Sequence, residues 1–335
     1  MQLLPLLYQR WRSREDALFS DARKAYVMTW RQNQARFAQL AALLQRFEAQ
    51  KVACVVLKGV ALTLRYYRDP GVRGMRDFDL LVNEQNVEVA AQALRAAGYE
   101  AEQGLDIHSI RRRVRVGHAW QFSFASDQTC DLHWRPLVRC YAPVVSEMFW
   151  EGAQRAPLGD RFVSVLSPTD QLFHVCAHGL QWDWTPQIRW VADALTVLRE
   201  AVDWVRIEEL AREAFMHIRL SRALSYLKDR FHARVPAAVL QKLEESAPDW
   251  ERVEYDLLLK QCPLGFRDSF AWHLHHFRRI RPFDDQWKRM PMALGFAQYV
   301  PAFLNAGDLP EVLRKLWPEM KARAAVGREE QSREA

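Results

Sequence analysis

Two aspartates that stand two residues apart are the clearest chemical signal in the sequence. Asp77 and Asp79 open the apolar hexapeptide DFDLLV, residues 77–82. On a β-strand, alternate side chains point to the same face, so these two carboxylates would project together while Phe78 and Leu80 face a core. Two carboxylates held that close repel each other unless a cation lies between them. The pattern therefore indicates either a metal site or a solvated acidic turn.

Basic residues precede the acid pair and favour the metal site. The apolar β-branched run at residues 52–57 predicts a strand, which ends at Lys58-Gly59, before an apolar helical segment and a loop that contains Arg73 and Arg76. Glycine permits close approach of the backbone to a phosphate, and the following helix offers its N-terminus to an anion. Lys58, Gly59, Arg73 and Arg76 are therefore candidates for phosphate binding. For Arg76 a salt bridge to the acidic strand is the alternative.

A third carboxylate follows in a predicted hairpin. Residues 120–124 and 129–134 have the pattern of two strands that are joined by a polar turn at residues 126–128. Asp131 lies on the second strand. If this strand pairs with residues 77–82, Asp131 joins the acid pair on one face of the sheet. The sequence alone leaves that register open.

Composition predicts a cytoplasmic globular protein with room for two domains. The chain has 335 residues, of which 49% are hydrophobic and 26% charged, with a formal net charge of +6. This mildly basic balance favours anionic ligands and indicates nucleic acid only weakly. The five cysteines have no metal-type spacing, and an odd count without a secretory signal indicates a reducing compartment. No run approaches the roughly 20 apolar residues that span a bilayer, so we expect no membrane contact.

The chemical motifs occupy only part of the chain. Helical periodicity predicts N-terminal helices in residues 1–50 that pack on a core at residues 51–140, where strands and helices alternate in an α/β or α+β pattern. From residue 136 the pattern is nearly all helical, which predicts a helical domain at residues 141–320. The polar, charged tail at residues 321–335 is expected to fray.

A strongly basic segment lies at residues 108–118, which contain Arg111, Arg112, Arg113 and Arg115. We interpret it as an exposed loop or strand edge that arginines keep soluble. Contact with phosphate or nucleic acid is the alternative.

Two histidines share one face of a predicted helix that begins at Ser167. His174 and His178 are four residues apart, but the segment lacks the intervening glutamate of a metalloprotease helix. We interpret each as a buried or partly buried histidine whose hydrogen bonds are satisfied.

The motifs together resemble a known family. The segments LKGVAL, RYYRDPGVRGMRDFDLLV, LRAAGYE, CDLHW and LSPTDQLFHVCAHG are similar to those of the uncharacterised nucleotidyltransferase-like family of bacteria, within the polymerase-β-type superfamily. The resemblance spans roughly residues 50–235. It implies an α+β fold in which helices flank a small mixed sheet and a mostly helical C-terminal half is appended.

The resemblance also implies a reaction. A nucleoside monophosphate would pass from an NTP to an unknown acceptor, which is a small molecule, a protein or RNA, with Mg²⁺ or Mn²⁺ as cofactor. The implied catalytic residues and metal ligands are Asp77, Asp79 and Asp131. One alternative is an inactive nucleotide-binding or scaffold protein, because Lys58-Gly59 stands where the wider superfamily has Gly-Ser. Another is a toxin-type enzyme that modifies tRNA.

Overall fold

A mixed β-sheet with helices on both faces forms the centre of the molecule. The computed structural model describes residues 3–10, 17–102, 107–124, 128–179, 188–259, 266–304, 306 and 310–311. The tail at residues 321–335, which the sequence predicts to fray, lies outside them. Within the described residues, no helix has the length and apolarity that a bilayer crossing requires.

The sheet contains seven strands in the described part of the chain. They are β1 (Cys54–Leu57), β2 (Asp77–Val82), β3 (Glu100–Ala101), β4 (Ala119–Phe124), β5 (Gln128–His133), β6 (Gln154–Leu158) and β7 (Arg161–Val165). Their order across the sheet is β3-β4-β5-β2-β1-β7-β6. Strand β2 is antiparallel to β1 and parallel to β5, whereas β1 is parallel to β7. This mixed sheet confirms the predicted fold class.

Helices precede, interrupt and follow the sheet strands along the chain. The first six are α1 (Leu4–Arg10), α2 (Ala17–Ala49), α3 (Lys58–Leu62), α4 (Val87–Ala96), α5 (Ile107–Val116) and α6 (Pro143–Glu151). The later ones are α7 (Pro168–Gly179), α8 (Arg189–Val197), α9 (Trp204–Ala214), α10 (His217–Phe231), α11 (Ala237–Ser246), α12 (Asp249–Leu259), α13 (Phe266–Ile280) and α14 (Met292–Phe303). A π-helical turn (Thr63–Tyr67) continues α3, and 3₁₀ turns occur at Glu84–Asn86, Arg281–Phe283 and Trp287–Arg289.

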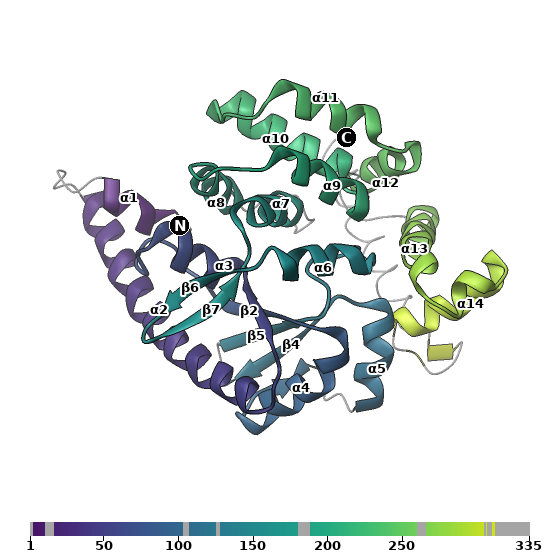
Figure 1. The fold of residues 1–335 in the computed structure, drawn as a ribbon, viewed down its shortest axis with the longest axis horizontal. Helices are drawn as coiled ribbons and strands as arrows, with labels where there is room; N and C mark the ends of the chain where they lie inside the picture. The colour runs from purple at the N-terminus through teal and green to yellow at the C-terminus, as the bar shows by residue number, and fades with distance from the viewer. Residues whose placement is uncertain are drawn as a thin grey trace, which may run out of the picture.

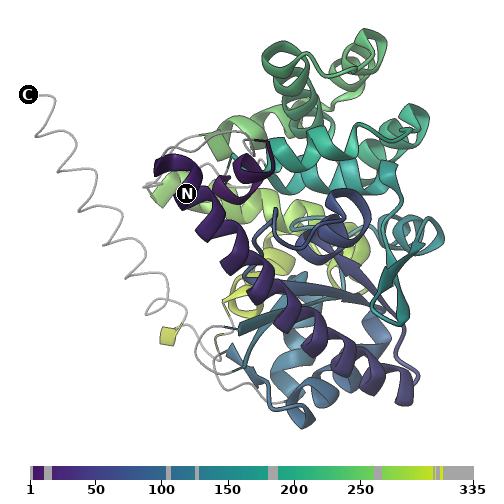
Figure 2. The ribbon, with the colours of Figure 1, turned by 90° about the vertical axis from the view of Figure 1, so that its left-hand side faces the viewer.

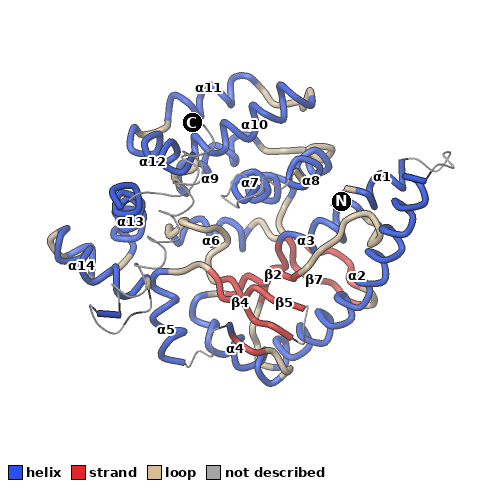
Figure 3. Tube along the Cα trace, turned by 180° about the vertical axis from the view of Figure 1, so that it is seen from behind, coloured by secondary structure: helices blue, strands red, loops and turns tan. Residues whose placement is uncertain are grey.

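The two faces of the sheet have different helical covers. The long helix α2 and the shorter α4 lie on one face, and the helical half with α7 to α12 lies on the other (Figures 1, 2 and 3). On β2, Phe78 and Leu80 pack in the buried cluster that includes Leu94 of α4, whereas Leu81 packs in the cluster that includes Phe173 of α7. Asp77 and Asp79 are an even number of residues from Leu81, so their side chains point to the same face of the sheet as Leu81 does. The acid pair therefore faces the helical half.

A strand pair lies inside the region that the sequence predicts to be helical. Strands β6 and β7 form an antiparallel hairpin, and β7 adds to the sheet beside β1. Their burial alternates along each strand, and Gly159 adopts a positive φ of 62° in the turn. The prediction that the chain beyond residue 136 is nearly all helix is therefore wrong for residues 154–165. The domain boundaries themselves stay predictions.

The basic segment at residues 108–118 is also different from the prediction. It forms most of helix α5 and not a loop or strand edge. Ile110 and Val114 are one helical turn apart, and both pack on the core of the sheet domain. Arg111 forms an ion pair with Glu88 of α4, and Arg115 lies 2.9 Å from a carboxylate oxygen of Asp284. These two arginines are engaged within the fold.

Helix α2 fixes the loop that leads to the acid pair. Asn33, which is fully buried, donates hydrogen bonds from Nδ2 to the carbonyl oxygens of Pro70 and Arg73, at 2.7 and 2.8 Å. The Tyr26 hydroxyl donates to Asp69 at 3.1 Å. Helix α2 thus does more than pack on the sheet, since these hydrogen bonds hold the loop in place.

Replacing Asn33 with alanine is expected to destabilise the protein by about 1–3 kcal/mol, because two loop carbonyls lose their donor in a buried position. Urea denaturation would measure the change in the free energy of unfolding. The matched control is alanine at Gln34, an exposed neighbour on the same helix. Equal stability of the two variants would contradict the role assigned to Asn33.

Candidate active site

The pairing of β2 with β5 brings the carboxylates together. In this parallel register Asp79 lies opposite Asp131, and Asp77 lies opposite Thr129. Asp79 is fully buried, whereas Asp77 and Asp131 are half-buried. The structure therefore places Asp131 on the face of the acid pair, in the register that the sequence left open.

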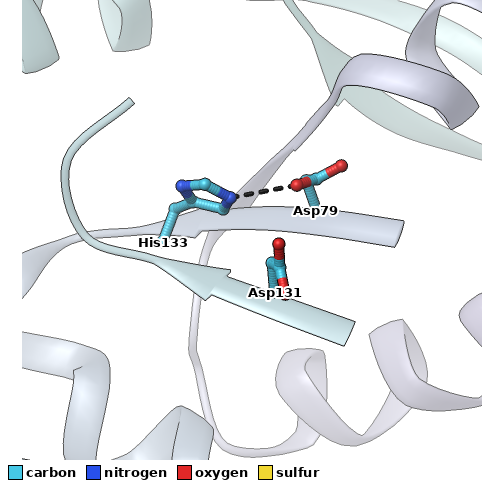
Figure 4. Close-up of side chains that lie close together, drawn as sticks. All are labelled: Asp79, Asp131 and His133. Atoms are coloured by element: carbon cyan, nitrogen blue, oxygen red, sulfur yellow. Dashed lines mark hydrogen bonds and ion pairs between the residues drawn. The ribbon is translucent and has the colours of Figure 1, made fainter. Parts of the chain in front are cut away.

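One oxygen of Asp79 has two partners and the other has none. Lys58 donates from Nζ to Oδ1 of Asp79 at 2.5 Å. Nε2 of His133 lies 3.0 Å from the same oxygen (Figure 4). The Lys58 backbone adopts a left-handed φ of 45°, a strained conformation that in non-glycine residues often occurs at functional sites. Oδ2 of Asp79 is buried without a hydrogen-bond partner in the described structure. The carboxylate is held in one orientation, with one oxygen left for a ligand.

Asp79, Asp131 and His133 form a compact group that fits a metal ion. Each offers a ligand atom, and these atoms lie within 4.8 Å of one another (Figure 4). Oδ1 of Asp131, like Oδ2 of Asp79, is buried without a partner among the described residues. Two such oxygens on neighbouring strands suit a hard divalent cation. The predicted third ligand, Asp77, lies outside this group, on the same face of β2.

The pKa of each of the three carboxyl groups depends on the charges of its neighbours. Burial, and then the charge of Asp79, raises the pKa of Asp131 to about 7. The same two causes raise the pKa of Asp77. Burial opposes ionisation of Asp79 too, but the Lys58 charge and the hydrogen bond with His133 outweigh it and hold its pKa below the ordinary value. A bound cation would relieve the repulsion that the other two carboxylates experience.

A cavity of about 300 Å³ adjoins Asp77 of the acid pair. It lies between the sheet domain, near the start of β2, and helices α7 and α8. Its lining includes all the predicted phosphate-binding residues and one of the acids, namely Lys58, Gly59, Arg73, Arg76 and Asp77. From the helical half, His178 and Arg189 also line it. The structure thus brings the predicted basic residues to a single cavity.

The predicted phosphate-binding residues have different surroundings. Arg73 forms a bidentate ion pair with Asp193 of α8, with both nitrogen–oxygen distances at 2.8 Å. A Cβ atom on Gly59 would lie 2.8 Å from Nη1 of Arg73 and 3.0 Å from Cβ of Met75, so a larger residue there would have to displace the guanidinium that Asp193 holds. Arg76 is exposed. The alternative interpretation of Arg76 was a salt bridge to the acidic strand. No such ion pair occurs within the described residues.

His174 is a buried histidine with a satisfied hydrogen bond, as predicted. Its Nε2 lies 3.0 Å from the carbonyl oxygen of Pro136, and its side chain is almost fully buried. Burial, with the positive charge of Lys58, lowers the pKa of His174 to about 3. The folded protein therefore keeps this imidazole neutral at a pH where the unfolded chain protonates it.

This lowered pKa predicts acid destabilisation with a defined window. His174 contributes stability above the unfolded pKa near 6.5, and this contribution is lost as the pH falls from there toward 3, by up to about 1.4 kcal/mol per pH unit. His174→Gln keeps an N–H donor for Pro136 and is expected to reduce the loss of stability between pH 7 and 5. Urea denaturation at both values measures it, with exposed His232→Gln as control. An unchanged pH dependence in His174→Gln would count against this origin.

Sequence reasoning missed three residues of the site. His133 follows Asp131 by two positions, so the strand alternation that aligned the aspartates could have placed it on the same face. Arg189 and Asp193 lie on α8, more than a hundred residues from the loop that they contact. No local pattern in the sequence connects these segments.

Comparison with known proteins identifies the family. A family model described as uncharacterised nucleotidyltransferase matches residues 1–232. Two solved structures show distant similarity. One is a crystal structure of the lincosamide antibiotic adenylyltransferase LnuA with lincomycin bound, at 14% identity and a TM-score of 0.32, over 48% of this chain and 94% of that one. The other is a solution structure of the antibiotic-resistance factor ANT(2'')-Ia, at 15% identity and a TM-score of 0.38, over 60% of this chain and 99% of that one.

No curated protein matches the chain. The family match includes the N-terminal helices, the sheet and the first helices of the helical half, and it spans well over half of the sequence. It agrees with the resemblance that the sequence motifs indicate. The protein belongs to the uncharacterised nucleotidyltransferase family.

Proposed function

We propose that the protein transfers a nucleoside monophosphate from an NTP to an acceptor in a reaction that depends on Mg²⁺ or Mn²⁺. The observation that carries this proposal is the pair of unpartnered buried oxygens on Asp79 and Asp131. Lys58, which contacts Asp79, also lines a cavity with several basic side chains. Nucleotidyl transfer requires carboxylates that can hold a metal ion. It also requires basic side chains beside them that can hold a polyphosphate.

The metal ligands in this proposal are Asp79 through Oδ2 and Asp131 through Oδ1, with Asp77 from the same face of β2. When bound, a divalent cation would neutralise charge on the polyphosphate and promote ionisation of the attacking hydroxyl. Oxygen ligands favour Mg²⁺ or Mn²⁺. His133 and Lys58 both contact Oδ1 of Asp79, so their proposed role is to orient this carboxylate.

The remaining residues position the reactants. Asp131 is more exposed than Asp79, so it is the proposed acceptor for the proton of the attacking hydroxyl. Lys58 and Arg76 are the proposed phosphate contacts from the sheet domain, because both line the cavity. Holding the reacting groups in line supplies much of the rate enhancement in phosphoryl-type transfer. The acceptor itself stays open.

The experiment that tests the proposal is calorimetric titration of each NTP with and without Mg²⁺. The wild type is expected to bind one or more NTPs only when the metal is present. Asp77→Ala is expected to weaken this binding, whereas alanine at Asp160, which is exposed in the β6–β7 turn, is expected to leave it unchanged. Binding that is absent, or that ignores both the metal and Asp77→Ala, would refute the catalytic proposal. Metal-independent binding would favour a nucleotide-binding scaffold.

A further inference from the structure

Arg189, at the start of α8, reaches from the helical half to the nucleotide cavity. Its Nη1 donates to the carbonyl oxygen of Gly74 at 3.0 Å, which places the guanidinium beside the loop that leads to β2. Its Nε is buried and has no hydrogen-bond partner in the described structure. A buried guanidinium donor without a partner is costly unless a ligand satisfies it.

The charges around the cavity are not evenly compensated. Asp193 neutralises Arg73, and Asp79 neutralises Lys58. Within the described residues, neither Arg76 nor Arg189 has a carboxylate at ion-pair distance. Burial, followed by the charge of Arg73, lowers the pKa of Arg189; the charge of Arg76 adds to this repulsion, and the charges of Asp193 and Asp77 offset part of it. An anion in the cavity would remove this mutual repulsion.

Two residues of helix α8 contact the loop that leads to β2. Arg189 and Asp193 are four positions apart, so they lie on the same side of the helix. Asp193 accepts hydrogen bonds from the Arg73 guanidinium and from the Tyr67 hydroxyl, the latter at 2.9 Å. These contacts hold the loop against α8, next to Arg189.

We infer that Arg189 and Arg76 bind the terminal phosphates of the nucleotide, and that Arg73 is a positioning residue that holds the Arg76 loop against α8. This inference rests on the proposed function and names the residues that distinguish a triphosphate from a monophosphate. A guanidinium offers several N–H donors in a planar fork, which matches the oxygens of a phosphate. The helical half thus contributes directly to the nucleotide site.

The test uses inorganic tripolyphosphate, because this probe needs no knowledge of the base. Calorimetry in the presence of Mg²⁺ would compare the wild type with Arg189→Gln and Arg76→Gln. Each variant is expected to bind tripolyphosphate and the preferred NTP about tenfold or more weakly, with little change in affinity for the corresponding monophosphate. Arg199→Gln, an exposed residue just beyond α8, is the matched control and is expected to bind as the wild type does.

The outcomes separate this inference from the proposed function. If the wild type binds an NTP with metal but Arg189→Gln or Arg76→Gln binds it equally well, the inference is overturned and the proposed function stands. If the wild type binds no NTP at all, both are overturned. Arg189→Lys keeps a charge and a donor for Gly74, so it is expected to retain more affinity than Arg189→Gln. Arg76 is exposed, which makes its variant informative even if Arg189→Gln folds poorly.

The role of Arg73 has its own test. The double variant Arg73→Met/Asp193→Leu removes the ion pair without leaving either charge buried alone. It is expected to bind tripolyphosphate more weakly than the wild type, because the loop that carries Arg76 loses its anchor on α8. In the Arg76→Gln background the same double change is expected to weaken binding by no more than about threefold further, since Arg73 acts through that loop. A further loss of about tenfold in that background would show that Arg73 contacts phosphate itself, and would overturn its assignment as a positioning residue.

Discussion

Asp131→Asn is expected to reduce nucleotidyl transfer by about a thousandfold or more while the metal-free protein stays at least as stable as the wild type. The loss follows because a metal ligand supplies several kcal/mol of transition-state stabilisation, and each ~1.4 kcal/mol is a factor of ten in rate. The retained stability follows from burial and from the nearby Asp79 charge, which both oppose ionisation of Asp131. Asparagine removes that penalty with little change in shape.

Three measurements check this prediction. Pyrophosphate release from the preferred NTP reports transfer, a Mn²⁺ titration followed by electron paramagnetic resonance reports metal affinity, and urea denaturation in EDTA reports stability. Asp79→Asn is the informative comparison, because it leaves the largely buried Lys58 ammonium without its carboxylate. That variant is expected to be destabilised, whereas Asp131→Asn is not. Wild-type Mn²⁺ affinity in Asp131→Asn would argue against its place in the metal site.

A large effect on stability is expected at the ion pair between Arg73 and Asp193. Only 10% of the Arg73 side chain and 5% of the Asp193 side chain are exposed. Asp193→Ala leaves a buried guanidinium uncompensated, which is expected to lower the free energy of unfolding by about 3–5 kcal/mol. It also removes the acceptor of the Tyr67 hydroxyl. Urea denaturation of the variant would measure the loss.

A double variant tests whether this loss comes from the unpaired charge. Arg73→Met/Asp193→Leu is expected to recover most of the stability that Asp193→Ala loses, because apolar side chains of similar size carry no unpaired charge. A single-variant loss below about 1 kcal/mol would instead indicate an exposed, weak ion pair.

Local patterns predicted the acid strand well. The predicted strand at residues 77–82 has the same bounds in the structure, and its two faces divide between the two buried clusters as the alternation requires. The hairpin that carries Asp131 was predicted for the same reason, since strand period and turn residues are short-range signals. Both depend only on neighbouring residues.

The arginine-rich helix shows how composition misled the prediction. Charge suggested an exposed loop or strand edge, but arginine is a good helix former, and an apolar stripe was present at Ile110 and Val114. The four-residue spacing of these two residues was the informative signal. The number of arginines around them gave no information about the secondary structure.

Contacts between distant segments could not be predicted from one sequence. The parallel register of β2 and β5 places Asp131 opposite Asp79, and nothing local determines it. The ion pair between Arg73 and Asp193 joins residues 120 positions apart. Such contacts depend on how the helical half packs on the sheet, which requires the complete fold.

The pairing of β1 with β7 has a consequence for synthesis of the chain. Strand β1 is central in the finished sheet, yet its parallel neighbour β7 begins about a hundred residues later in the sequence. At ~5–20 residues per second a ribosome needs roughly 5–20 s to cover that interval. During this time one edge of the apolar strand β1 has unpaired backbone groups that could pair with another chain. We therefore expect the yield of folded protein to depend on protection of the nascent chain until the β6–β7 hairpin has been made.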